Sequence, residues 1–178
     1  MVQVSNQALV TGEVYVPGLP REYVAERYGV PLDEISKLAS AENPHGASPK
    51  ALAAVEAVRV RLDIYPDWTA KKLREAIGER YGFDPDGVVC GSGETEVISM
   101  VIRAFAGPDD AILMHKPCFP IYRIYTACEG RRALFSPMGE DFDPQVDRYI
   151  ELLRSGPRIA FVTNPHNPSG RGIGEADL

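Results

Sequence analysis

The stretch from residue 88 to residue 116 reads VVCGSGETEVISMVIRAFAGPDDAILMHK. It contains two short apolar runs, residues 88–90 and 111–114, and each is typical of a buried strand. Between them, residues 94–106 carry apolar side chains at helical spacing. A strand, a helix and a second strand in this order predict a parallel β-α-β unit.

The same alternation continues toward the C-terminus. Helices are predicted over residues 119–128 and 144–154, and strands over 132–135 and 159–162. We therefore predict an α/β fold, with a mainly parallel sheet covered by helices on both faces.

The sequence before residue 88 predicts helices, together with one segment whose structure the pattern leaves open. Residues 35–39 fit either a short strand or an extended linker. Glycine or proline marks the ends of each predicted helix. The predicted helices are residues 21–28 ending at Gly29, a helix that begins at Pro49 after Ser48, and residues 69–81 ending at Gly82.

Composition narrows the class of protein. The 178 residues are 44% hydrophobic and 25% charged, which is ordinary for a globular domain. The net charge of −6 argues against a general nucleic-acid binder. Neither an apolar run of about 18 residues nor a secretory signal is visible, so we expect no membrane partner. Three cysteines (Cys90, Cys118 and Cys128) form no C-x-x-C pair and favour a reducing cytoplasm.

Three loops follow predicted strands and contain more polar and aromatic residues than a simple connection requires. They are GSGETE at residues 91–96, HKPCFP at 115–120 and TNPHNPSG at 163–170. In an open α/β sheet, ligands bind beyond the carboxyl ends of the strands. We therefore expect the three loops at one edge of the sheet.

Each loop also has a purely structural interpretation. The first loop either points backbone N–H groups at an anion or forms a tight turn, and it matches neither a dinucleotide fingerprint nor a P-loop. Phe119 either packs in the core or stacks on a planar ligand. In the third loop, Asn164 and Asn167 each precede a proline. Their side-chain amides either project from the end of the strand or hydrogen-bond to their own backbone. The histidines, His45, His115 and His166, are expected in loops and show no metal-site spacing.

Taken in order, the motifs resemble one known family. NPHNPSG at residues 164–170 is similar to an element of the fold-type I pyridoxal-phosphate-dependent aminotransferases, and more narrowly of the histidinol-phosphate aminotransferase family. YVPG at 15–18, KLASAENPHG at 37–46, YPD at 65–67 and GSGETE at 91–96 support the resemblance. PCFPIY at 117–122 adds a further match.

The resemblance implies a cofactor, pyridoxal 5'-phosphate, and a role for several residues. Backbone groups of Gly93, Glu94 and Thr95 are implied to hold its phosphate, while Phe119 stacks on its ring. Asn167 is implied to hydrogen-bond its phenolic oxygen. Tyr65 is implied to reach the cofactor phosphate of the partner subunit in a homodimer. The residues implied to lie near the small-molecule substrate are Tyr15, Asn43 and Gly46.

The resemblance also implies the reaction and the domain plan. The family transfers an amino group between histidinol phosphate and 2-oxoglutarate in histidine biosynthesis. The implied plan is an N-terminal arm and small-domain segment at residues 1–48 and a partial large cofactor-binding domain at 49–178.

Three departures from the family pattern leave alternatives open. Ala41 stands where the family usually has asparagine, and Gly93-Glu94-Thr95-Glu96 also resembles the related threonine-phosphate decarboxylases. The family's Schiff-base lysine lies beyond Gly170, and none of the five lysines here matches its position. The sequence therefore also allows an inactive fragment or a dimerisation partner.

Overall fold

The computed structural model describes residues 15–175 and divides them into two compact units. One unit contains Tyr15 and residues 77–175, and the other contains residues 16–76. The domain boundary predicted between residues 48 and 49 stays a prediction.

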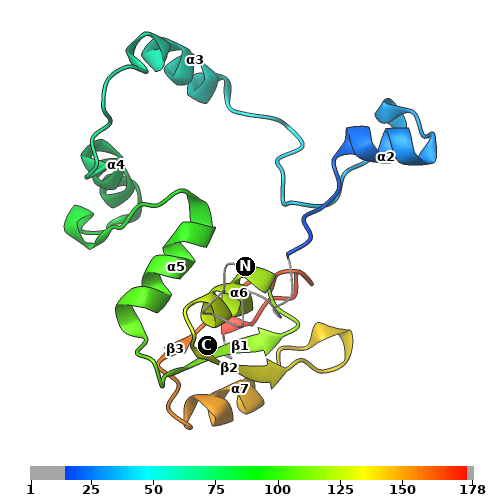
Figure 1. Cartoon of the computed structure of the whole chain (residues 1–178), viewed down its shortest axis with the longest axis vertical. Coiled ribbons are helices and arrows are strands. Elements are labelled where there is room, and N and C mark those ends of the chain that lie inside the picture. Colours follow the sequence, from blue (N-terminus) through cyan, green and yellow to red (C-terminus); the bar gives the residue numbers. More distant parts are fainter. Residues whose placement is uncertain (1–14, 176–178) are drawn as a thin grey trace, which may run out of the picture. The chain divides into compact units, whose positions relative to one another are not determined.

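Helices dominate the first half of the described chain, and strands alternate with helices in the second half (Figure 1). The elements are α2 (Arg21–Tyr28), η1 (Leu32–Glu34), α3 (Pro49–Val58), η2 (Arg59–Arg61), α4 (Lys71–Tyr81), η3 (Pro85–Gly87), α5 (Gly93–Phe105), β1 (Ala111–Lys116), α6 (Pro120–Cys128), β2 (Arg132–Pro137), η4 (Glu140–Phe142), α7 (Val146–Leu153) and β3 (Ile159–Ala160).

The strands of the larger unit form a parallel sheet in the order β2-β1-β3. β1 pairs with β2 along its whole length, from Ala111 opposite Arg132 to Lys116 opposite Pro137. β3 pairs with the other side of β1, with Ile112 opposite Ile159. This topology confirms the predicted α/β fold with a parallel sheet.

The two faces of the sheet are covered by different helices. Ile112 and Met114 of β1 belong to a buried cluster with side chains from α5 and α6, including Ile102. His115 stacks instead against Tyr149 of α7, with ring centroids 4.5 Å apart. Because successive side chains of a strand point to opposite faces, α5 and α6 cover one face and α7 contacts the other. Helices on both faces were predicted.

Helix α5 brings its N-terminus to the edge of the sheet where β1 ends. Its C-terminal end lies at the start of the strands, because the side chain of Arg158, just before β3, donates to the carbonyl of Phe105 at 2.8 Å. The Arg131 side chain donates to the Ala106 carbonyl at 3.0 Å. These bonds satisfy carbonyls that a helix end leaves without partners. They fix the helix that precedes β1.

The strand predicted at residues 88–90 is wrong. The structure places these residues in an extended segment without ladder pairing, and 69% of Val89 is exposed. A strand exists only through hydrogen bonds to a neighbouring strand, and no strand within residues 15–175 pairs with this segment. The run is apolar, as the sequence shows, but it pairs with no strand among the described residues.

The unit of residues 16–76 confirms most of its predicted elements. α2 ends at Gly29, whose φ of +68° is the left-handed conformation that glycine adopts readily. α3 begins at Pro49 as predicted. The segment at 35–39 is a linker and not a strand.

The helix expected from residue 69 begins two residues later, at Lys71. The Asp67 carboxylate accepts hydrogen bonds from the N–H groups of Thr69 and Lys71 at 2.9 and 3.1 Å. These bonds lower the pKa of Asp67, and the hydrogen bond from the Thr69 hydroxyl has the largest effect. Asp67 therefore supplies the start signal that was missed.

No helix within residues 15–175 has both the length and the apolar content that a membrane crossing requires.

Candidate functional site

The first of the three predicted loops leads into the N-terminus of α5. Gly93 has a φ of +79°, and its N–H donates to the Gly91 carbonyl at 2.8 Å. The Glu96 carboxylate accepts the N–H of Ser92. No backbone acceptor among the described residues takes the N–H groups of Glu94 and Thr95. These two N–H groups, at the positive end of the helix dipole, can bind an anion.

The second loop presents an aromatic ring. Phe119 is half-buried directly before α6, and its ring meets that of Tyr122 edge to face, 5.8 Å between centroids. The Tyr15 ring lies against it in the same manner at 6.4 Å. The structure thus combines both interpretations of Phe119, since the ring packs on Tyr122 and keeps accessible surface for a planar ligand.

The third loop uses its two asparagines differently. The Asn164 side chain accepts the N–H of Ile173 at 3.0 Å and donates to its carbonyl at 3.3 Å, which closes the loop. Asn167 is exposed, and none of the hydrogen bonds among residues 15–175 uses its side chain. Asn164 follows the structural interpretation, whereas Asn167 is available to a ligand.

Tyr122 is the point at which the three loops meet. Its ring stacks on Phe161, just after β3, with centroids 4.4 Å apart. Its hydroxyl accepts a hydrogen bond from the Thr163 hydroxyl at 3.1 Å. Burial chiefly, and the nearby Glu94 carboxylate as a further cause, raise the pKa of Tyr122. Glu94, Phe119 and Thr163 each belong to a different loop, so the predicted meeting of the loops at one edge is confirmed.

The role of Tyr122 gives a stability prediction. Tyr122→Phe keeps the stacked ring but leaves the Thr163 hydroxyl without its acceptor. Because Tyr122 is only 7% exposed, we expect the free energy of unfolding to fall by about 1–3 kcal/mol. Urea unfolding followed by circular dichroism measures this change. A Thr163→Val change alone should cost less, and equal stability of wild type and Tyr122→Phe would contradict the prediction.

Two histidines expected in loops are instead buried. His115 lies within β1, is 4% exposed, and its Nε2 lies 3.1 Å from the Pro144 carbonyl. His166 is also 4% exposed, although Asn167 beside it is exposed. Their rings meet edge to face at 5.9 Å. Sequence reasoning missed His166 and Tyr122 because their partners are distant in sequence. The one available signal was the aromatic residue three positions after Phe119, on the same face of a helix.

His115 gives a prediction for pH. Burial is the main cause that lowers the pKa of His115 below its ordinary value of 6.5. The folded chain therefore binds fewer protons than the unfolded chain below that value. Hence the free energy of unfolding should fall as the pH drops from about 7 toward 5.

The matched variants for this test are His115→Gln and His45→Gln, since His45 is exposed. Urea unfolding at a series of pH values should show a flatter pH dependence for the former only. Parallel curves for wild type and His115→Gln would show that another group causes the loss.

Three of the predicted site residues belong to the unit of residues 16–76. The Asn43 side chain turns back on its own loop, donating to the Gly46 carbonyl at 2.9 Å and accepting the His45 N–H at 3.0 Å. Tyr65 is 88% exposed. The roles of Asn43, Gly46 and Tyr65 stay predictions, because these residues belong to a different unit from Glu94, Phe119 and Asn167.

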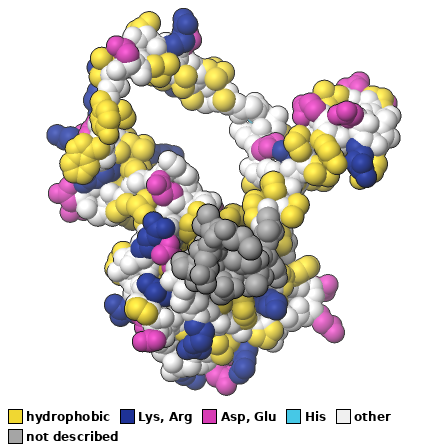
Figure 2. All heavy atoms as spheres, viewed as in Figure 1, with side chains coloured by type: hydrophobic (Ala, Val, Ile, Leu, Met, Phe, Trp, Pro, Cys, Tyr) yellow, Lys and Arg dark blue, Asp and Glu magenta, His cyan; other side chains and the backbone are white. Residues whose placement is uncertain are grey.

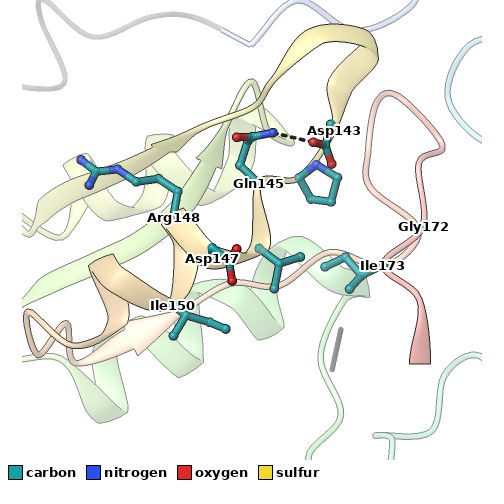
Figure 3. A pocket seen from close by; sticks show the side chains of 9 residues that line it. Asp143, Gln145, Asp147, Arg148, Ile150, Gly172 and Ile173 are labelled. Carbon is teal, nitrogen blue, oxygen red and sulfur yellow. Dashed lines mark hydrogen bonds between the residues drawn. The ribbon is translucent and has the colours of Figure 1, made fainter. Parts of the chain in front are cut away.

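A separate hollow of about 500 Å³ lies between the start of α7 and residues 172–173 (Figure 3). Asp143, Gln145, Asp147 and Arg148 line it, and Gln145 donates to the Asp143 carboxylate. None of the predicted site residues lines this hollow. It therefore offers no support for the predicted site.

The chain is similar to curated proteins and to solved structures. The chain is 39% identical over 163 residues to the histidinol-phosphate aminotransferase of Roseiflexus castenholzii, covering 89% of this chain and 44% of the relative. It is 34% identical to that of Akkermansia muciniphila, covering 98% of this chain and 48% of the relative. The chain thus spans about half the length of the curated relatives it matches.

Among solved structures, histidinol-phosphate aminotransferase from Clostridium acetobutylicum is 26% identical, with a TM-score of 0.67 over 78% of this chain and 40% of that one. The enzyme from Sinorhizobium meliloti, in complex with pyridoxal-5'-phosphate, has a TM-score of 0.72 at 18% identity. That match covers 94% of this chain and 44% of the other, and it shows the fold alone.

A family model described as aminotransferase class I and II matches residues 33–178, which is most of the chain. The fold predicted from the alternating pattern is that of these solved aminotransferases. The chain therefore belongs to the aminotransferase class I and II family.

Proposed function

We propose that this chain forms the cofactor-binding part of a pyridoxal-phosphate-dependent aminotransferase that transfers the amino group of histidinol phosphate to 2-oxoglutarate in histidine biosynthesis. Support for the substrate comes from the curated relatives of that name, which match 89% and 98% of this chain. Support for the cofactor comes from the bound structure of similar fold.

The residues at the edge of the sheet fit this cofactor, and their meeting around Tyr122 is the observation that carries the proposal. The N–H groups of Glu94 and Thr95 suit a phosphate dianion. The Phe119 ring suits the face of a pyridine ring. The Asn167 amide suits a phenolic oxygen and has no competing partner among the described side chains.

Each residue contributes positioning more than bond making. Glu94 and Thr95 anchor one end of the cofactor, and Phe119 fixes the plane of its ring. Asn167 donates to the phenolic oxygen and so favours its charged form. When bound, pyridoxal phosphate supplies the electron sink that stabilises charge on the substrate carbon next to the transferred nitrogen.

On the substrate side we propose Tyr15, Asn43 and Gly46. Tyr15 is supported by its contact with Phe119, which places a phenol beside the proposed ring site. The turn of Asn43 and Gly46 is held by its own hydrogen bonds and keeps polar backbone groups exposed.

We also propose a homodimer in which Tyr65 serves the partner's cofactor phosphate. Support comes from the exposed apolar side chains of residues 52–68. In Figure 2, yellow spheres of hydrophobic side chains lie along the α3 segment. Leu52, Val55 and Val58 share one face of α3 and are each more than half exposed. Such surfaces are commonly buried by self-association.

We place the protein in the cytoplasm. Cys90 and Cys118 are half-buried free thiols in the structure. Free half-buried thiols suit a reducing compartment.

The direct test of the cofactor proposal is equilibrium dialysis of the chain against pyridoxal phosphate. We expect saturable binding that inorganic phosphate displaces, because both anions compete for the turn at Glu94 and Thr95. Absence of binding, or binding that phosphate does not affect, would overturn the proposal.

A further prediction concerns lysine. We expect borohydride treatment of the chain with pyridoxal phosphate to label no lysine specifically. Lys116 is the last residue of β1 and so lies at the edge of the sheet. Its ammonium nitrogen lies over the Phe135 ring, 5.4 Å from the ring centroid. Peptide mapping measures the label, and stoichiometric labelling of a single lysine would refute the prediction.

The substrate test starts from the fact that the chain spans about half the length of its curated relatives. We suggest producing the chain together with the part of the Roseiflexus castenholzii relative beyond the matched region. Glutamate formation from 2-oxoglutarate should then depend on histidinol phosphate. Release of carbon dioxide from threonine phosphate instead would favour the decarboxylase alternative.

A further inference from the structure

His166 is a buried side chain in a loop whose neighbouring residues are exposed. Only 4% of it is accessible, whereas Pro165 and Asn167 are both exposed. Both of its ring nitrogens have hydrogen-bond partners on the chain. A buried ring with both nitrogens hydrogen-bonded indicates that His166 anchors its surface loop to the rest of the fold.

The partners of the ring determine its proton position. Nε2 lies 3.0 Å from the Pro117 carbonyl oxygen, which can only accept, so Nε2 carries the proton. Nδ1 lies 2.8 Å from the Ser169 hydroxyl and accepts from it. The Ser169 oxygen in turn accepts the Arg171 N–H at 3.3 Å. The neutral Nε2–H tautomer satisfies every member of this chain of bonds.

The ring also rests on a fixed layer of the fold. It meets the His115 ring of β1 at 5.9 Å, and His115 stacks on Tyr149 of α7. The Tyr149 hydroxyl donates to the Phe161 carbonyl at 2.9 Å. The backbone N–H of His166 donates to the Arg171 carbonyl at 2.7 Å. His166 therefore cannot shift without disturbing β1, α7 or the closure of its own loop.

The bond to Pro117 joins two of the loops at the sheet edge. Pro117 lies two residues before Phe119, and His166 directly precedes Asn167. We propose that His166 is a positioning residue that holds the Asn167 amide in place relative to the Phe119 ring, so that both can contact the same planar cofactor. This inference rests on the proposed function, because it assumes that the cofactor lies between these two side chains.

Three variants separate anchoring from general stability. His166→Leu removes both ring hydrogen bonds. His166→Gln keeps an amide N–H within reach of the Pro117 carbonyl. Ile102→Val trims a fully buried core residue of α5 that makes none of the hydrogen bonds of the His166 ring, and it serves as the destabilised control.

The first readout is the dissociation constant for pyridoxal phosphate. We expect His166→Leu to raise it about tenfold, His166→Gln to restore it to within about threefold, and Ile102→Val to leave it unchanged. If wild type binds the cofactor and His166→Leu binds it equally well, the inference is wrong while the proposed function stands. If wild type itself does not bind, the proposed function fails.

The second readout needs no cofactor. Nitrogen-15 NMR of the histidine rings should show His166 as the Nε2–H tautomer, with assignments from the His115→Gln and His45→Gln variants. The side-chain amide signals of Asn167 should move in His166→Leu and return in His166→Gln. An Nδ1–H tautomer, or Asn167 signals that ignore His166→Leu, would overturn the inference whether or not the cofactor binds.

Discussion

Replacing Gly93 with valine is expected to raise the dissociation constant for pyridoxal phosphate about tenfold or more. Gly93 has a φ of +79°, which a β-branched residue strongly disfavours. The strain of about 1–3 kcal/mol can be relieved only by moving the turn, and this movement displaces the N–H groups of Glu94 and Thr95. Equilibrium dialysis measures the change.

Gly93→Asn is the matched control. Asparagine tolerates the left-handed conformation much better than valine, and no atom outside the adjacent residues and the backbone of α5 itself lies within 4 Å of an added Cβ. We therefore expect Gly93→Asn to keep most of the affinity. Equal losses for asparagine and valine would indicate that side-chain bulk matters here and that backbone conformation does not.

Replacing Tyr65 with phenylalanine is expected to weaken cofactor retention in a full-length relative that has tyrosine at this position. The proposed loss is one hydrogen bond to a charged phosphate, about 1.5–3 kcal/mol, or roughly a 10- to 150-fold rise in the dissociation constant. Tyr65 is 88% exposed within its own unit, so its substitution leaves packing there nearly unchanged. Unfolding midpoints that match those of wild type would confirm that point.

Mixed dimers show whether Tyr65 acts across the interface. One subunit carries the Tyr65→Phe change, and the other keeps Tyr65 but lacks the Schiff-base lysine. If the tyrosine serves the partner's site, the lysine-bearing site receives an intact Tyr65 and retains normal cofactor affinity. If that site loses cofactor as readily as the Tyr65→Phe homodimer, the tyrosine serves its own subunit and the proposal is wrong.

The sequence predicted the elements whose local pattern agrees with their packing. α6 was expected at residues 119–128 and spans Pro120–Cys128, with Ile121 and Tyr122 buried. β1 and α7 also lie where they were expected, with ends shifted by up to two residues. In these segments periodicity, capping residues and the location of the core all favour the same structure.

The segment at residues 88–90 shows where this agreement ends. Val88, Val89 and Cys90 have the composition of a buried strand, yet they lack a neighbour within the described residues. Strand formation depends on hydrogen bonds to backbone that is distant in sequence. A local pattern therefore identifies a candidate strand without identifying its partner.

The candidate site divides in a similar way. Motifs selected the turn at residues 93–95, Phe119 and Asn167 as candidates, because each lies in a recognisable loop after an apolar segment. They did not identify Tyr122 or His166, whose partners Thr163 and Pro117 are 41 and 49 residues away. Contacts between loops follow from the strand order β2-β1-β3, which residue patterns do not reveal.

The edge strand β2 has a consequence for how the protein avoids aggregation. One side of β2 pairs with β1, and its other side forms no ladder within residues 15–175. An open edge of this kind is a template on which a strand of another molecule can assemble. β2 begins with Arg132 and ends with Pro137, and both side chains are exposed. A charge at one end and a missing N–H at the other discourage such growth, so replacing both residues with valine should promote fibrils in which β2 strands of successive molecules pair.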